Sequence, residues 1–352
     1  MLLTVLTEYI IPIIYDSFVT LVLVLFILFI FRIKDSGIRV LFFFLPLIKP
    51  FLVISERFEP NPGYIDKQTV NSGLRIPDPT NIFSGFKDFD TFYLFVSDFN
   101  YQLIFIFVIT ILVILIIRWI NLYLFYGKLA FEEKVTRDEV PAIYAIMDKF
   151  AERTAIRIPD VSLTHRKYIS PFVVGVRNIT LVICPSLFEI LDQSEKETVI
   201  HHELSHVKRK DNLISWIAMM LKDILFFNPF AYISYFLIRT EQDSGSDKVM
   251  VKYSGRHKKE IAKSLLGAII KLKSTVSGDN VTGPAQVLSF NPGGFFSQCR
   301  LENRIRSILL TDNDRIRMRV LPRIMMFLLF FLILVLQIFF IIPINNFNIY
   351  LR

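Results

Sequence analysis

The sequence predicts a mainly α-helical membrane protein, in which four transmembrane helices carry a cytoplasmic α+β domain between the third and the fourth. The 352 residues are 53% hydrophobic and include 35 phenylalanines, a composition typical of integral membrane proteins. Several stretches reach the roughly 20 predominantly apolar residues that a membrane-crossing helix needs. Most lysines and arginines instead lie in one long block before the last of these stretches.

Three stretches meet this length requirement: residues 10–31, 103–124 and 324–342. Asp16 interrupts the first, and Arg118 lies near the end of the second. We expect all three to be transmembrane helices.

Residues 40–54 form a shorter apolar segment that contains Pro46, Lys49 and Pro50. Because proline removes a backbone donor, this segment is either a kinked span or a re-entrant helix. A span here agrees better with the distribution of charge, so we expect four spans in total.

Basic residues set the orientation of these spans. Arg32, Lys34 and Arg39 follow the first span, whereas residues 55–101 carry more acidic than basic groups. Positive charge stays in the cytoplasm, so the amino terminus and the acidic loop are expected outside. The chain then divides into two N-terminal membrane segments (1–54), an extracellular loop (55–100), a third transmembrane helix (101–126), a cytoplasmic domain (127–321), a fourth transmembrane helix (322–343) and a short extracellular tail (344–352).

The net charge of +8 invites a nucleic-acid hypothesis. Membrane placement accounts for it more simply, because a cytoplasmic domain beside anionic lipid headgroups is expected to be basic. We therefore expect the lipid bilayer as a partner and no nucleic acid.

The stretch His202-Glu203-x-x-His206 points to the chemistry of the domain. On a helix, the two histidines lie one turn apart and can reach one metal ion, while Glu203 projects beside them as a general base. This arrangement is the core of a zinc peptidase. Short motifs also occur by chance, and the alternative is a pair of surface histidines on an amphipathic helix.

The surrounding sequence favours the metal site. Ser194 and Glu197 have the spacing of a capping box at a helix start, and an apolar stripe follows them. His201 has no partner one turn on, because residue 205 is serine. We interpret His201 as a residue that supports the site or the core.

The block before this motif reads as a mixed α+β unit. Residues 138–154 predict an amphipathic helix, and residues 161–164, 172–176 and 179–183 predict short strands. Zinc peptidases commonly bind substrate by adding it to a sheet edge. Residues 172–176 are our candidate for that edge, and a plain core strand is the alternative.

A second helix after the motif must supply a third ligand. The pair Asn228-Pro229 predicts a break between a helix at 213–227 and another at 230–251. The later helix carries an acidic cluster of Glu241, Asp243 and Asp247. At about 1.5 Å per residue a straight hairpin would misplace these groups, so the motif helix must bend or end near residues 210–212.

In combination these features resemble the BlaR/MecR-type family of integral membrane zinc metallopeptidases. The resemblance covers nearly the whole chain, including four spans and a protease domain between the third and the fourth. It implies a zincin-like (gluzincin-like) metallopeptidase domain that uses zinc. It is carried by these stretches: Ser170-Pro171-Phe172-Val173-Val174-Gly175, Cys184-Pro185, His202-Glu203-x-x-His206-x-Lys208-Arg209-Lys210-Asp211, Asn228-Pro229 and the acidic cluster.

The sequence departs from that family in two ways. Family members that sense β-lactams carry an extracellular penicillin-binding domain after the last span, and this sequence ends at Arg352, about ten residues past its last apolar segment; we expect no such sensor domain. The family also has a glutamate ligand followed four positions later by an aspartate. That spacing fits Asp243 as ligand and Asp247 as an acceptor that orients a ligand imidazole, with Glu241 as the rival ligand.

The resemblance and the motif together predict a zinc endopeptidase. Zinc held by His202, His206 and Asp243 would activate water with Glu203 as the base. His165 and Arg239 are candidates to stabilise the transition state, although for His165 we favour the interpretation as an ordinary loop histidine at the end of a strand.

The predicted role is regulated or signalling proteolysis of a protein or peptide. One alternative is a quality-control or processing protease of the HtpX or CAAX-prenyl-protease kind, and another is a non-catalytic membrane signal transducer. The Pro- and Gly-containing residues 277–297 predict a loop that acts as a lid or a self-cleavage site. The sequence leaves open the substrate, the oligomeric state and whether residues 55–100 bind a ligand.

Overall fold

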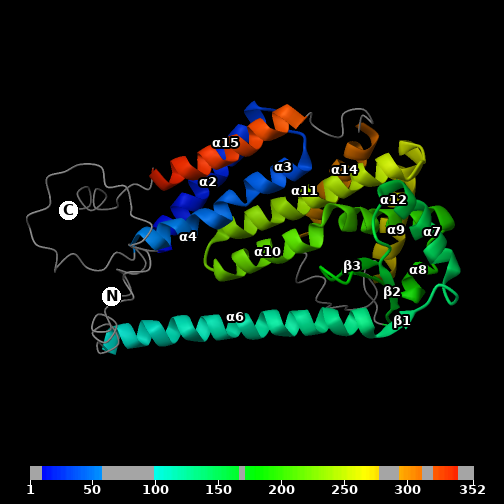
Figure 1. The fold of residues 1–352 in the computed structure, drawn as a ribbon, viewed down its shortest axis with the longest axis horizontal. Coiled ribbons are helices and arrows are strands. Elements are labelled where there is room, and N and C mark those ends of the chain that lie inside the picture. Colours follow the sequence, from blue (N-terminus) through cyan, green and yellow to red (C-terminus); the bar gives the residue numbers. More distant parts are fainter. Residues whose placement is uncertain (1–9, 58–98, 166–170, 277–292, 311–319, 340–352) are drawn as a thin grey trace, which may run out of the picture.

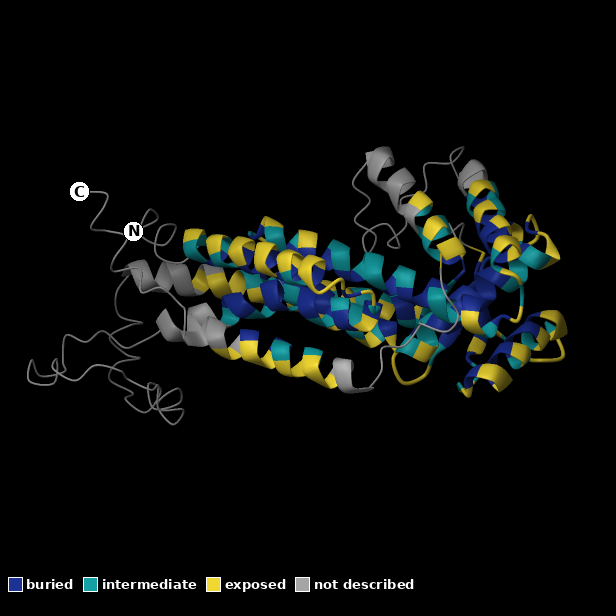
Figure 2. Cartoon of the chain, turned by 90° about the horizontal axis from the view of Figure 1, so that it is seen from above, coloured by how far each residue is buried: buried dark blue, intermediate teal, exposed yellow. Residues whose placement is uncertain are grey.

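The computed structural model describes residues 10–57, 99–165, 171–276, 293–310 and 320–339. Figure 1 shows a bundle of long helices, one end of which carries a small sheet and shorter helices. Buried residues lie between the helices of the bundle and where the bundle meets the sheet-bearing end (Figure 2). The described chain is mostly helical, as the sequence predicts.

The N-terminal part folds into a helix and a broken helix. Residues 40–54, expected as one kinked span, belong to two consecutive helices that Phe44 separates. Pro46 has no backbone N–H with which to continue the first of them, which accounts for the break. The three helices are α2 (Ile11–Ile30), α3 (Ser36–Phe43) and α4 (Leu45–Arg57).

Two helices among the described residues are long and apolar enough to cross a membrane, namely Ile11–Ile30 and Val108–Phe131. The second lies within α6 (Phe99–Phe131). The last expected span coincides with α15 (Val320–Phe339), whose apolar stretch Ile324–Ile333 is shorter. Spans at α4 and α15 therefore stay predictions. The expected extracellular loop and tail lie largely outside the described residues.

A four-stranded sheet of order β1-β2-β4-β3 follows α6. The β2–β4 pair is parallel, and the β1–β2 and β3–β4 pairs are antiparallel. β3 lies at one edge of the sheet, as expected for residues 172–176. The sequence did not predict β1, because two exposed charged residues and one half-buried valine are too few to give an alternating pattern. The strands are β1 (Glu133–Val135), β2 (Asp160–Leu163), β3 (Phe172–Val174) and β4 (Thr180–Ile183).

Two helices cover the buried core of this sheet: α7 (Pro141–Thr154), where the sequence predicts a helix, and α9 (Gln193–Arg209). Phe150, Leu181 and Ile200 belong to the apolar cluster between them. The short helix α8 (Pro185–Phe188) joins β4 to α9. This core fixes the helix that carries the histidine motif.

The capping box of α9 lies two residues earlier than the sequence analysis placed it. Asp192, not Ser194, is the N-cap, and Glu195, not Glu197, closes the box. Both pairs have the required spacing, and only Asp192 has the extended backbone of an N-cap. Ser194 instead contacts Ser264, at 2.5 Å between the hydroxyl oxygens.

The motif helix ends where the hairpin geometry requires. Lys210 adopts a left-handed conformation with φ of 58° and separates α9 from α10 (Asp211–Ile224). Asn228 then caps α11 (Pro229–Tyr253) by accepting from the N–H of Phe230. The chain therefore turns back along itself and returns α11 to the motif helix.

The α10–α11 hairpin packs along the N-terminal helices, and Trp216 of α10 also packs beside Val174 and Val182 of the sheet. Residues from α2, α3, α4, α10 and α11 share one apolar cluster, and Figure 1 shows these helices side by side. At the hairpin tip, Asn228 donates to Ser17 of α2 at 2.7 Å. Part of the block that we assigned to the cytoplasm thus lies along a helix able to cross a membrane.

The two remaining helices are α12 (Lys258–Val276) and α14 (Gly293–Leu310). α12 packs on α9 and on α14. Residues 277–292 of the expected loop lie outside the described residues, and residues 293–297, also expected in that loop, form the first turn of α14.

Candidate metal centre

The motif histidines face each other on the buried side of α9. Their Nε2 atoms are 3.2 Å apart, and the rings lie edge to face with centroids 4.8 Å apart. The helical spacing of four residues places both side chains on one face. Glu203 lies beside them, half-buried on the same turn.

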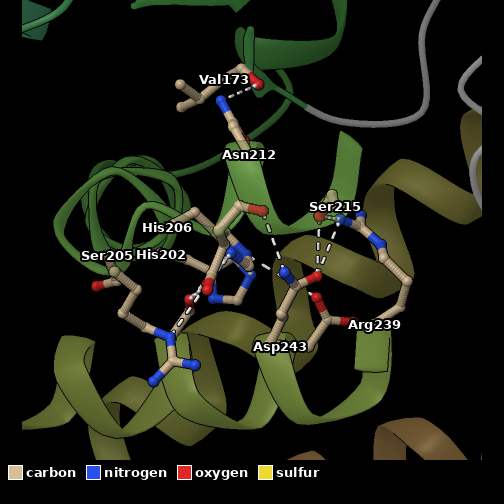
Figure 3. Close-up of polar contacts among 12 residues, drawn as sticks. Val173, His202, Ser205, His206, Asn212, Ser215, Arg239 and Asp243 are labelled. Atoms are coloured by element: carbon tan, nitrogen blue, oxygen red, sulfur yellow. Dashed lines mark hydrogen bonds and ion pairs between the residues drawn. The ribbon is translucent and has the colours of Figure 1, made fainter. Parts of the chain in front are cut away.

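Asp243 completes a group of three potential ligands. Its Oδ1 atom is 3.9 Å from Nε2 of His206, and one ligand atom each from His202, His206 and Asp243 lie within 4.8 Å of one another. Two imidazole nitrogens and one carboxylate oxygen are a usual donor set for zinc. The residues present therefore fit a zinc ion, and Figure 3 shows them converging from α9 and α11.

Each histidine has a carboxylate behind it. His202 Nδ1 lies 2.9 Å from Asp247, and His206 Nδ1 lies 2.9 Å from Asp211. Such contacts fix the ring orientation and leave Nε2 for a metal. Asp247 thus lies where an orienting acceptor was expected, whereas no role was predicted for Asp211. The sequence feature that could have identified Asp211 is its position directly after the end of the motif helix.

Two arginines hold these carboxylates. Arg304 of α14 contacts both oxygens of Asp247, at 2.8 and 2.7 Å, and Arg209 Nε contacts Asp211 at 3.1 Å. Burial alone would raise the pKa of Asp247, but Arg304 and His202 together hold this pKa below its ordinary value. Burial likewise opposes ionisation of Asp211, and contacts with His206 and Arg209 lower its pKa overall. Neither arginine has a role that the sequence predicts.

The other predicted site residues take different positions. Glu241, the rival ligand, is not part of the three-residue ligand group and pairs with Arg39 at 2.7 Å. Arg239 lies half-buried one turn before Asp243 and donates to Ser215 Oγ at 2.8 Å, close to the centre (Figure 3). His165 is 81% exposed and pairs with Glu133 at 3.1 Å. None of the contacts described for His165 reaches the centre.

His201 packs in the core on another face of α9. Its ring stacks on Phe150 with centroids 4.8 Å apart. Burial lowers the pKa of His201 to about 4, so the imidazole is neutral at physiological pH. The structural interpretation of this residue agrees with that placement.

Comparison with known proteins yields one family and several partial relatives. A family model described as BlaR1 peptidase M56 matches residues 37–285. A "Protease HtpX homolog" from Gemmatimonas aurantiaca is 26% identical over 143 residues, covering 38% of this chain and 51% of the relative. A homologue of the same name from Pyrococcus abyssi is 32% identical over 117 residues, covering 32% of this chain and 40% of the relative.

A third relative is the "Methicillin resistance mecR1 protein" of Staphylococcus aureus. It is 32% identical over 88 residues, which cover 25% of this chain and 15% of the relative. The chain thus spans about half, or less, of the length of the curated relatives that it matches.

Proposed function

The chain belongs to the BlaR1 peptidase M56 family, and we propose that it is a membrane-embedded zinc endopeptidase that hydrolyses peptide bonds at the cytoplasmic face. The observation that carries the proposal is the convergence of His202, His206 and Asp243 within 4.8 Å. Relatives named as proteases support the same reaction class.

Each residue of the proposed site has its own role in the reaction. A bound zinc ion would act as a Lewis acid toward the scissile amide. The Glu203 carboxylate would accept the proton of the attacking water and then pass it to the leaving amine. Asp247 and Asp211 accept from the Nδ1 side of the two histidines and would so leave both Nε2 atoms to hold the ion.

Arg239 is the better of the two candidates for stabilising negative charge in the transition state. It lies half-buried one turn before Asp243 on α11, and a fixed cation there favours charge that develops during the reaction. His165 is exposed and paired with Glu133, so we assign it no role in the reaction.

The apolar helices support a membrane location. In the apolar window of α6 only 6% of the residues are buried inside the protein, so its side chains face outward, as in a helix that contacts lipid. The basic residues after α2 support a cytoplasmic metal centre. The α10–α11 hairpin lies along α2, so we place the centre close to the membrane surface.

We favour regulated or signalling proteolysis as the role. The family match and the mecR1 relative support this role. The HtpX homologues favour the alternative of a quality-control or processing protease, because they match longer parts of the chain. Cleavage of one partner protein would support signalling, and cleavage of many unfolded membrane proteins would support quality control.

The test compares the purified full-length chain with Glu203→Gln. We expect both to bind zinc and only the wild type to cleave an unfolded protein such as casein, because the amide of glutamine cannot accept the proton. Glu197→Gln on the same helix is the control. The Glu197 carboxylate lies 3.9 Å from the guanidinium of Arg256, two residues before α12. Equal cleavage by wild type and Glu203→Gln would refute a peptidase, and zinc binding without cleavage by either would favour a non-catalytic transducer.

A further inference from the structure

We infer that Arg209 is a positioning residue: it holds Asp211 against the ligand His206 and links this pair to the turn between α2 and α3. The inference rests on the proposed zinc centre. Through Arg209, the membrane-associated region between α2 and α3 sets the orientation of the proposed ligand His206.

The contact with Asp211 is the first step. Three groups meet one oxygen of this buried carboxylate, Oδ2: Nδ1 of His206 at 2.9 Å, Nε of Arg209 at 3.1 Å and the hydroxyl of Ser246 at 3.1 Å. Of these groups Arg209 alone carries a permanent positive charge. A buried carboxylate that loses its cation becomes costly to keep ionised, so the orientation of His206 depends on Arg209.

The packing of α11 shows that space is kept for this guanidinium. A Cβ atom on Gly245 would collide with the end of the Arg209 side chain. Glycine inside a helix is destabilising relative to alanine, and at residue 245 the absent side chain lets α11 pass over Arg209. Gly245 also lies two residues after Asp243 on α11. The Arg209 guanidinium therefore lies between α9 and α11, the two helices that carry the proposed ligands.

The guanidinium of Arg209 also reaches the start of α3. Its Nη1 atom donates to the hydroxyl of Ser36 at 3.5 Å, and Ser36 is buried. α3 and the turn before it also contact α11 on both sides of Asp243: Arg39 of α3 pairs with Glu241 at 2.7 Å, and Lys248 donates to the carbonyl of Lys34 in the turn at 3.0 Å. The turn after α2, together with the start of α3, is therefore bonded to both helices that carry the proposed metal ligands.

The experiment measures zinc affinity and the visible spectrum of the cobalt-substituted, full-length protein in detergent. Arg209→Gln should weaken zinc binding roughly 10-fold, as loss of support for a ligand does, and should shift the cobalt spectrum. Arg209→Lys should retain part of the affinity, because it restores the charge.

Gly245→Ala tests the same contact without removing the arginine. It should displace the guanidinium and weaken zinc binding, and it should add nothing in the Arg209→Gln background, because residues that act through one contact are not additive. Ser36→Ala should weaken zinc binding less than Arg209→Gln does. If Arg209→Gln does not fold, Gly245→Ala and Arg209→Lys carry the test.

Arg153→Gln is the matched control. Arg153 donates to the backbone carbonyls of Tyr253 and Ser254 at the end of α11, so its loss should lower stability while zinc affinity and the cobalt spectrum stay unchanged. Wild-type affinity and spectrum in Arg209→Gln, or additive effects of Arg209→Gln and Gly245→Ala, would overturn the inference. Wild-type affinity in Ser36→Ala would overturn the link to the turn. A wild-type chain that binds no zinc would instead overturn the proposed function itself.

Discussion

At the scale of residues, the centre is defined by which acidic group on α11 faces the histidines. Asp243 and Glu241 are two positions apart on a helix, so they point in different directions around its axis. Asp243 turns toward α9, whereas Glu241 turns toward Arg39 of α3. The sequence ranked Asp243 first by its spacing to Asp247, and the structure supplies the physical reason.

Paired substitutions on α11 test this choice. Asp243→Asn should lower the zinc content of the purified protein and abolish cleavage, because an amide is a much weaker zinc ligand than a carboxylate. Glu241→Gln should keep zinc and cleavage and lose only the pairing with α3. Zinc content measured by mass spectrometry checks both, and the reverse pattern would make Glu241 the ligand.

His201 gives a prediction about pH. Its pKa is about 4 in the folded chain and roughly 6.5 when unfolded, so only the unfolded chain takes up the proton between these values. Stability must therefore fall as the pH falls from about 6.5 to 4, by at most roughly 3 kcal/mol from this group.

Replacing the ring removes that dependence. His201→Phe should flatten the loss of stability between pH 6.5 and pH 4, measured as Tm in the presence of a chelator, while retaining the stack on Phe150. His257→Phe is the control, since His257 is exposed. An equal acid-induced loss in wild type and His201→Phe would contradict the account.

At the scale of elements, four helices meet at the proposed centre. α9 and α11 carry the proposed ligands, the start of α10 carries Asp211, and α14 carries Arg304. Sequence reasoning found the first two because HExxH and the acidic spacing are local patterns. It missed Arg304 because that arginine lies 57 positions from Asp247, and nothing local distinguishes it from its neighbours.

Arg304→Gln tests the role of α14. Asp247 is 1% exposed, and removing one partner of a buried ion pair typically costs about 3–5 kcal/mol. We expect a marked fall in Tm together with weaker zinc binding, because His202 loses its fixed acceptor. Arg306→Gln, an exposed position on the same helix, should change neither quantity. Unchanged zinc affinity in Arg304→Gln would show that Asp247 orients His202 unaided.

At the scale of the whole molecule, the sequence predicted the kinds of elements better than their packing. The apolar runs and the three strands follow from local patterns, whereas the break at Lys210 follows from the distance that a straight hairpin would put between the histidines and the acidic cluster. The placement of the α10–α11 hairpin against α2, α3 and α4 does not, because the apolar residues of a hairpin fit a domain core or a membrane bundle equally well. The capping box of α9 was misplaced because Ser194 and Asp192 both satisfy its spacing.

Buried polar contacts join α6 to this hairpin. Asp223 of α10 is 1% exposed and lies 3.4 Å from Arg118 and 3.2 Å from the indole nitrogen of Trp119. Lys222 contacts the same carboxylate at 2.6 Å. Asp223 is thus a main polar connection between α6 and the bundle among the described residues.

Asp223→Asn should loosen that connection. We expect a larger fall in Tm than in Asp148→Asn, whose surface pair with Arg137 contributes at most about 1 kcal/mol. Limited proteolysis should also cut the α6-linked region faster in Asp223→Asn. Equal Tm values in the two variants would mean that α6 is held by apolar contacts alone.

The central claim is that His202, His206 and Asp243 together bind one zinc ion. X-ray absorption at the zinc edge of the full-length protein tests it most directly. We predict one zinc per chain with nitrogen and oxygen ligands at about 2.0–2.2 Å, an imidazole signature, and loss of the metal in His206→Ala. A sulfur-ligated zinc, or the same spectrum in His206→Ala, would contradict the account.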